Sequence, residues 1–125
     1  MLSHHLLPKK SYWALLPMLT AIVFASPTDV VLNSPSTITP HSMTLTWSQN
    51  TDLDFQRYLV YKGTTESFDT TGKKIADIGT ATTTTTTASG LRVTTDYYFK
   101  IFVRNQQGVI SAGSNEVSAV TLPNA

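Results

Sequence analysis

Three side chains that could bind a metal ion lie at alternate positions: Asn50, Asp52 and Asp54. Their oxygen atoms are the ligands that Ca²⁺ prefers, and alternate spacing is typical of a calcium-binding loop. The EF-hand pattern also requires a glycine and a distal glutamate, but Phe55 and Lys62 stand where that support is needed. We therefore interpret the segment as an Asx-type turn, whose side-chain oxygens accept hydrogen bonds from backbone N–H groups, and predict no metal site.

Residues for acid–base or nucleophilic catalysis are scarce. A Ser-His-Asp arrangement needs a histidine base, and His41 follows Pro40 in a predicted turn, where we expect a solvent-exposed side chain. Paired carboxylates would need a cleft between them, and the 6 glycines are scattered rather than gathered in a phosphate-binding loop. With 0 cysteines the chain has no thiolate metal site, no disulfide and no cysteine nucleophile. We predict a protein that is not an enzyme and has no cofactor.

The composition indicates one all-β domain. The chain has 125 residues, of which 41% are hydrophobic, enough for a single core. Threonine contributes 21 residues, and its branched side chain favours strands over helix interiors. The net charge of +1 provides no electrostatic attraction for nucleic acid, so we predict no nucleic-acid partner.

The first 25 residues have the layout of a secretory signal peptide. Lys9 and Lys10 precede an uncharged, mostly apolar run that ends in small residues around Ala25. This run has about 15 residues, fewer than the roughly 20 that a membrane-spanning helix needs. We expect cleavage before Ser26, a mature chain without a membrane span, and a secreted or cell-envelope location (periplasm or cell surface). An uncleaved N-terminal anchor is the alternative.

Residues 26–125 form the predicted domain, in which short alternating runs of apolar residues are separated by turn residues. The predicted strands cover residues 30–32, 42–47, 58–62, 74–78, 82–87, 97–104 and 116–121. Seven strands in about 100 residues favour a two-sheet sandwich with Greek-key connections. We interpret the threonine run 82–87 as a weak edge strand; an O-glycosylated stalk is the alternative, but it would call for interspersed prolines.

Residues 91–97 (LRVTTDY) resemble the tyrosine corner of fibronectin type III domains, in which Leu91 would precede the corner Tyr97 by six residues. Trp47, residues 58–61 and the turn at 105–108 are also similar to that family, over residues 26–122. The chain departs from the family at Val93, where proline is usual, and in the small inward residues of the threonine run. The resemblance implies a seven-stranded, immunoglobulin-like antiparallel β-sandwich. Its core would contain Trp47, Tyr58, Val60, Leu91, Tyr97, Phe99, Ile101 and Val103.

Strand alternation then predicts an exposed face on the two strands at 58–62 and 97–104. Residues between the inward ones point to the opposite side of the sheet. The resemblance implies that these two strands are neighbours, so we expect the following side chains to share one outer surface: Leu59, Tyr61, Tyr98, Lys100, Phe102 and Arg104. Aromatic rings beside cations are typical of contact surfaces, although cross-strand pairing that only stabilises the sheet is the alternative. We predict a module that binds a protein or a surface, or acts as a spacer; the alternative is an accessory module that contacts polysaccharide.

Overall fold

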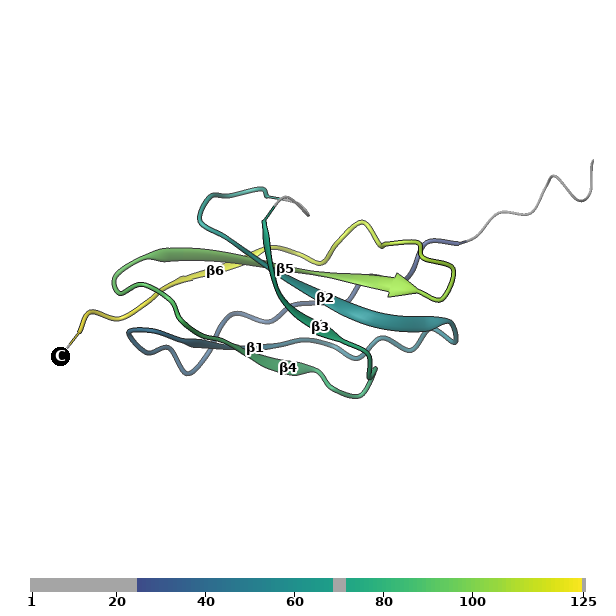
Figure 1. Ribbon diagram of the computed structural model, residues 1–125, viewed down its shortest axis with the longest axis horizontal. Helices are drawn as coiled ribbons and strands as arrows, with labels where there is room; N and C mark the ends of the chain where they lie inside the picture. The colour runs from purple at the N-terminus through teal and green to yellow at the C-terminus, as the bar shows by residue number, and fades with distance from the viewer. Residues whose placement is uncertain (1–24, 69–71, 125) are drawn as a thin grey trace, which may run out of the picture.

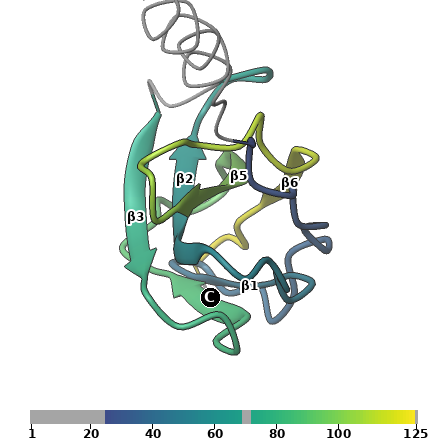
Figure 2. The same cartoon turned by 90° about the vertical axis from the view of Figure 1, so that its right-hand side faces the viewer.

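The chain forms a sandwich of two antiparallel β-sheets (Figure 1). A computed structural model describes residues 25–68 and 72–124, so that nearly all of the predicted signal peptide lies outside the described residues. These two ranges contain six strands: β1 (Met43–Thr46), β2 (Phe55–Gly63), β3 (Lys73–Ile78), β4 (Thr85–Ala88), β5 (Asp96–Asn105) and β6 (Val117–Val120). β1 pairs with β4, and the other sheet has the order β3-β2-β5-β6, which Figure 2 shows as one layer above β1 and β4. The part of the chain with coordinates contains no helix that is long and apolar enough to cross a membrane.

The core lies between the two sheets and is formed by alternate residues of each strand. On β5 the residues from Tyr97 to Val103 with odd numbers are buried, and on β2 Tyr58 and Val60 are fully buried. All of the residues predicted for the core belong to one buried cluster, together with others such as Met43 and Leu45 of β1. Trp47 meets the Tyr58 ring edge to face, with 5.4 Å between the ring centroids. The period of two along β2 and β5 thus directs one apolar set into the interior.

The tyrosine corner is confirmed. The Tyr97 hydroxyl accepts a hydrogen bond from the backbone N–H of Arg92 at 2.9 Å. The Arg92 carbonyl accepts a hydrogen bond from the Thr121 hydroxyl. This hydroxyl in turn accepts a hydrogen bond from the Thr95 N–H at 2.9 Å. The ring of Tyr97 therefore fills the core while its hydroxyl satisfies a backbone group of the connection before β5.

The prediction of a seventh strand at residues 30–32 is wrong, because this segment makes only isolated bridges to its neighbours. Leu32 bridges to Trp47, and Ser36 bridges to Thr44. Pro35, which has no N–H to donate, lies between these bridges and interrupts a regular ladder. On the other side of the segment, the Asn115 side chain bonds to the N–H of Leu32 at 2.9 Å and to its carbonyl at 2.8 Å. The segment closes the sandwich without being a regular strand.

The last strand is also shorter than predicted, since β6 covers Val117–Val120 rather than residues 116–121. Before it, two serine hydroxyls accept hydrogen bonds from β5: Ser111 Oγ from the N–H of Val103 at 3.0 Å, and Ser114 Oγ from that of Ile101 at 2.9 Å. Side-chain oxygens therefore replace the ladder next to this half of β5. Ser111 and Ser114 also donate their own N–H groups to the carbonyls of Val103 and Ile101, at 2.8 Å and 2.9 Å, so that the segment is held beside β5 without forming a regular strand.

Candidate functional site

The predicted contact face is the outer surface of the four-stranded sheet, on β2 and β5. The register places Leu59 opposite Phe102, and Tyr61 opposite Lys100. These side chains point away from the core, as strand alternation requires. The expectation that all of them are exposed is wrong, however, because Leu59 is 6% exposed and Phe102 is 4% exposed.

Phe102 is buried because a loop covers it. Gly113 lies so close that a Cβ at this position would be 2.8 Å from Cε2 of the Phe102 ring. The Tyr61 ring meets Phe102 edge to face, with 5.6 Å between centroids, and the Lys100 ammonium lies 6.0 Å from the same ring. Phe102 and Leu59 thus form a small second core on the outer face, which supports Tyr61 from below.

The accessible part of this face consists of Tyr61, Tyr98, Lys100 and Arg104, and we call it the outer patch. The first three are half-buried and Arg104 is exposed. Partial burial raises the pKa of the Tyr98 hydroxyl above its usual value, and the nearby carboxylates of Glu66, Asp96 and Glu116 act in the same direction. The outer patch is therefore cationic around Lys100 and Arg104 and acidic beyond Tyr98.

An ion-paired group borders the outer patch on the β3 side. Asp77 accepts hydrogen bonds from Arg57 and from Lys74, the latter at 3.0 Å. The hydrogen bond from Lys74, reinforced by the charges of both cations, holds the pKa of Asp77 below its usual value. One carboxylate between two cations leaves a surplus of positive charge at this border.

The alternating residues before β2 form the predicted Asx turn. The Asn50 side-chain oxygen accepts a hydrogen bond from the N–H of Asp52 at 2.9 Å, and Asn50 itself is buried. The Asp52 carboxylate accepts hydrogen bonds from the N–H and the hydroxyl of Thr28, each at 2.8 Å. The bond from the Thr28 backbone is the main reason why the pKa of Asp52 lies below its usual value. These oxygens tie the first described residues to the turn, and among the residues with coordinates no group of three or more His, Cys, Asp or Glu side chains could hold a metal ion.

His41 is exposed, as predicted, and its contacts are structural. Its Nδ1 lies 2.8 Å from the carbonyl oxygen of Leu91. Its own carbonyl accepts a hydrogen bond from the Leu91 N–H at 3.0 Å. His41 thus links the turn before β1 to the connection that leads into β5.

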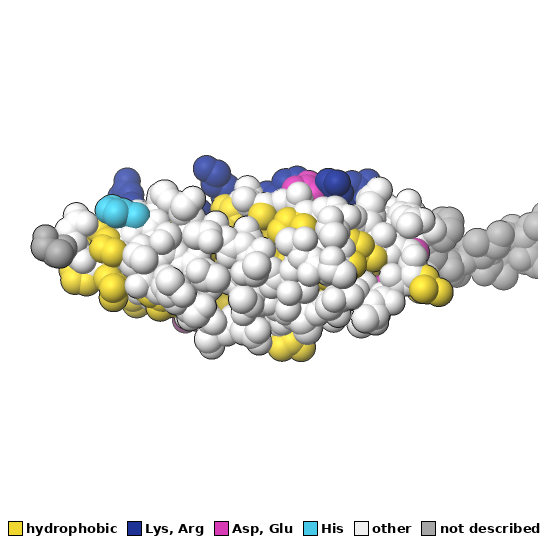
Figure 3. Space-filling model, turned by 90° about the horizontal axis from the view of Figure 1, so that it is seen from below, with side chains coloured by type: hydrophobic (Ala, Val, Ile, Leu, Met, Phe, Trp, Pro, Cys, Tyr) yellow, Lys and Arg dark blue, Asp and Glu magenta, His cyan; other side chains and the backbone are white. Residues whose placement is uncertain are grey.

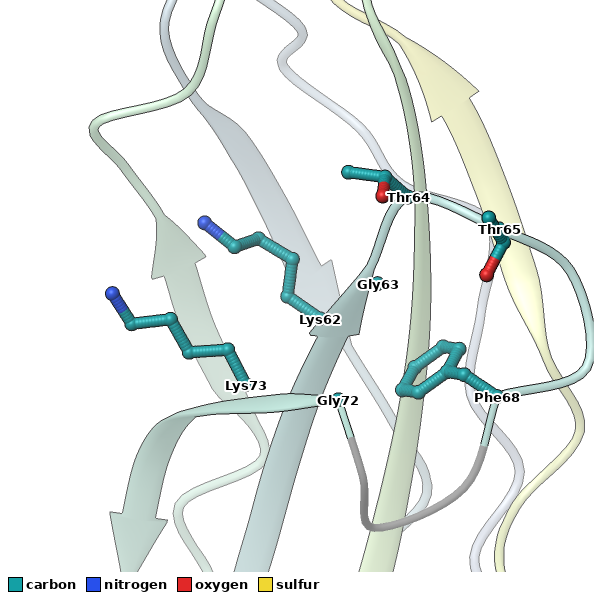
Figure 4. A pocket seen from close by; sticks show the side chains of 7 residues that line it. All are labelled: Lys62, Gly63, Thr64, Thr65, Phe68, Gly72 and Lys73. Carbon is teal, nitrogen blue, oxygen red and sulfur yellow. The ribbon is translucent and has the colours of Figure 1, made fainter.

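A pocket of about 330 Å³ lies where the β2–β3 hairpin opens (Figure 4). Lys62 pairs with Lys73 across the two strands, and both side chains extend to one side while the Phe68 ring lies on the other. Phe68 packs against Gly63 and Gly72, where a Cβ would stand 2.9 Å and 2.6 Å from its ring. The described residues of the lining supply two ammonium groups, threonine hydroxyls and one aromatic ring, and no acid–base pair among them.

Sequence reasoning missed the residues that cover the outer face. One of them is Gly113. Sequence reasoning also missed Glu116, whose carboxylate accepts a hydrogen bond from the N–H of Ser67 at 2.9 Å and so holds the 64–68 loop near β6. The available signal was the glycine itself, which adopts a φ of 113° that other residues rarely adopt. The contact between Ser67 and Glu116 joins residues far apart in sequence and leaves no local pattern.

Comparison with known proteins gives consistent results. The sequence model described as "Fibronectin type III domain" matches residues 25–120. Chitinase A1 of Niallia circulans is 34% identical over 97 residues, which are 77% of this chain but only 12% of that protein. The solution structure of a fibronectin type-III domain from human fibronectin type III domain containing protein 3 superposes with a TM-score of 0.64 at 21% identity, over 83% of this chain and 94% of that one. A β-1,2-glucanase from Parabacteroides distasonis gives a TM-score of 0.66 at 17% identity, over 82% of this chain and 14% of that one. The two structural likenesses show a shared fold.

Proposed function

Because this chain belongs to the fibronectin type III domain family, we propose that it acts as an exported, non-catalytic module that binds a protein partner through the outer patch. The observation that carries this proposal is the position of Tyr61 beside Lys100 on neighbouring strands, with Arg104 further along β5. Tyrosine and arginine contribute much of the binding energy of protein interfaces. The half-buried rings and the cations of this sheet face therefore suit a protein surface.

The support beneath Tyr61 favours binding. Its ring rests edge to face on Phe102, which is itself held under Gly113. A side chain that is already ordered loses little conformational entropy when a partner covers it. The outer patch is thus a rigid contact surface, and its affinity does not depend on ordering a loop.

Export is the expected route to the partner. The basic and apolar pattern of residues 1–25 supports secretion or retention in the cell envelope. A partner would then be a protein of the periplasm, the cell surface or the surrounding medium. The same route is compatible with a spacer that has no partner of its own.

The identity with chitinase A1 favours a second candidate, an accessory module that contacts polysaccharide. In this case the tyrosine rings of the outer patch would pack against sugar rings, and the cations would lie beside them. Binding to a protein and binding to a polysaccharide would depend on the same residues. A single pair of variants therefore distinguishes either kind of binding from a spacer.

The test uses tagged protein purified from the cells that export it, with mass spectrometry of co-purifying proteins. The variant Tyr61→Ala/Lys100→Ala removes the centre of the outer patch, and Thr44→Ala/Thr46→Ala trims the other sheet as the matched control. We expect a co-purifying protein that the first variant loses and the control retains. Phe102 is not suitable for this purpose, because its burial would confound binding with unfolding.

Retention on insoluble chitin or another glycan, measured with the same variants, tests the second candidate. If the parent protein is retained and Tyr61→Ala/Lys100→Ala is not, the partner is a polysaccharide and not a protein. If neither a protein nor a glycan distinguishes the two variants, the outer patch is not a binding site and the chain acts as a spacer.

A further inference from the structure

β4 has an open edge with free hydrogen-bonding groups. In the described part of the chain its neighbour in the sheet is β1. The Thr84 carbonyl faces β1, where it accepts a hydrogen bond from the N–H of Trp47 at 3.0 Å. Because backbone groups alternate in direction along a strand, those of Thr86 also face β1 and those of Thr85 and Thr87 point to the open edge. Thr85 and Thr87 are both exposed, so their N–H and C=O groups are accessible to another strand.

β4 itself carries no charged side chain. The sequence between Asp77 and Arg92 contains neither charged residues nor proline, and the sequence between Asp29 and Asp52, which includes β1, contains no Lys, Arg, Asp or Glu. Figure 3 looks from below onto the side of the molecule that carries β1 and β4, where uncharged side chains fill most of the surface and Lys and Arg gather along one border. A strand without charged side chains of its own adds no electrostatic repulsion when it approaches an identical strand.

The β3 edge of the other sheet provides the contrast. β3 carries Lys73, Lys74 and Asp77, and its pairing with β2 is shifted between Val60 and Tyr61 by a bulge or irregularity. Charged side chains and bulges are the usual means by which proteins prevent an edge from pairing. β4, by contrast, has neither a charged side chain nor a shift in its register with β1.

We propose that β4 pairs with β4 of a second copy of this chain, antiparallel about a two-fold axis at Thr86. This register opposes Thr85 of one copy to Thr87 of the other, so that the free groups of both residues bond to each other. A register shifted toward the start of the strand would require Thr83, whose N–H already donates to the Thr80 carbonyl at 3.1 Å. Threonine opposite threonine is a favourable cross-strand pair, and one surface serves both copies.

The resulting dimer is weak and depends on concentration, because a strand of 4 residues buries little surface. Its formation joins two β1–β4 sheets into one continuous sheet. The outer patch lies on the opposite sheet and stays accessible, so that a dimer would present two copies of it to a partner.

Sedimentation velocity over a range of concentrations tests the proposal on protein from the exporting cells, with the N-terminus of each sample defined by intact mass. In Thr85→Lys/Thr87→Lys, lysine faces lysine across the two-fold axis, and we expect the dissociation constant to rise roughly tenfold or more. The matched control Thr44→Lys/Thr46→Lys adds the same charge to the outer face of β1, one strand away from the edge, and should dimerise like the parent. Circular dichroism checks that each variant is folded.

Opposite charges provide the restoring experiment. Mixing the lysine variant with Thr85→Glu/Thr87→Glu should recover association, because the register then opposes lysine to glutamate. The chain has 0 cysteines, so that Thr85→Cys mixed with Thr87→Cys should form a disulfide-linked dimer more readily than either variant alone.

The proposal is overturned if the parent protein stays monomeric at every concentration. It is overturned in the same way if the protein stays monomeric and the edge instead binds an extended peptide of another protein. A dimer that the β1 control weakens as much as the β4 variant also overturns it. If the β4 variant fails to fold, the cysteine mixture decides: cross-links without preference for the mixed pair contradict the register and the proposal with it.

Discussion

Gly113 rests on the ring of Phe102, with 2.8 Å between Cε2 of the ring and the place where a Cβ would lie at position 113. Its φ of 113° is a second reason why other residues are unfavourable there. We expect Gly113→Ala to lower the free energy of unfolding by about 1–3 kcal/mol, because the added methyl must displace a packed ring. Denaturant unfolding followed by Trp47 fluorescence measures this loss.

Gly90→Ala is the matched control for that substitution. Gly90 also has a positive φ, 68°, but a Cβ there would meet no atom within 4 Å. The backbone cost alone is about 1 kcal/mol. Equal losses in the two variants would show that the contact with Phe102 does not constrain position 113.

Phe102→Ala should behave as a core substitution although the side chain lies on the outer face of the sheet. Only 4% of the Phe102 surface is exposed, so we expect the substitution to lower the free energy of unfolding by about 3–5 kcal/mol. Tyr98→Ala, on the same strand and face but half-buried, should lose clearly less. A loss below about 1 kcal/mol for Phe102→Ala would mean that the loop at residues 111–115 leaves the ring open to solvent.

Tyr97→Phe isolates the hydrogen bond of the tyrosine corner. The substitution retains the ring and removes the acceptor of the 2.9 Å bond from the Arg92 N–H. We expect a loss of about 1–2 kcal/mol in the free energy of unfolding, because the N–H is left without its partner. Tyr61→Phe makes the same chemical change at a tyrosine of the outer patch, and should alter the free energy of unfolding by a few tenths of a kcal/mol at most. If Tyr97→Phe leaves the free energy of unfolding unchanged, water replaces the lost acceptor.

The direction of each side chain could be read from the sequence, but what covers it could not. Alternation along residues 97–103 directs Phe99 and Ile101 into the core, and both are fully buried. The same alternation directs Phe102 outward, yet a loop that contains Gly113 buries it. A period of two defines the two faces of a strand and carries no information on segments that fold over them later in the chain.

The first predicted strand fails for a related reason. Val30 and Leu32 are buried and have the apolar character of a strand. Regular pairing also requires uninterrupted backbone donors, and Pro35 supplies none between the bridges at Leu32 and Ser36. The Asn115 side chain, which replaces a neighbouring strand at Leu32, is far away in sequence and has no local signature.

Asp52→Asn should change how stability depends on pH. Hydrogen bonds from Thr28 hold the pKa of Asp52 in the folded protein below its unfolded value, so that its ionised form stabilises the fold fully above the unfolded pKa of about 4. This contribution is lost as the pH falls through the lower, folded pKa. We expect the variant to be less stable by about 1 kcal/mol at pH 7, and the difference to shrink in acid. Asp77, whose pKa is also lowered, is present in both proteins and cancels.

Unfolding curves at intervals from neutral to acid pH measure this effect. Asp54→Asn, two residues further along the same turn, is the control. A difference between parent and Asp52→Asn that stays constant across the acid range would show that the carboxylate contributes through its shape and not through its charge.

Thr86→Val should stabilise the protein, because Thr86 is half-buried on the inner side of β4 opposite Leu45. Replacing its hydroxyl by a methyl adds apolar surface to the core, and we expect a gain of about 0.5–1 kcal/mol in the free energy of unfolding. Thr87→Val, which makes the same change on the exposed side of the strand, should alter stability by no more than a few tenths. Denaturant unfolding of the two variants side by side gives the comparison. A loss of stability in Thr86→Val would mean that the Thr86 hydroxyl makes a hydrogen bond worth more than the added burial, and that the inner side of the threonine run is held by polar contacts.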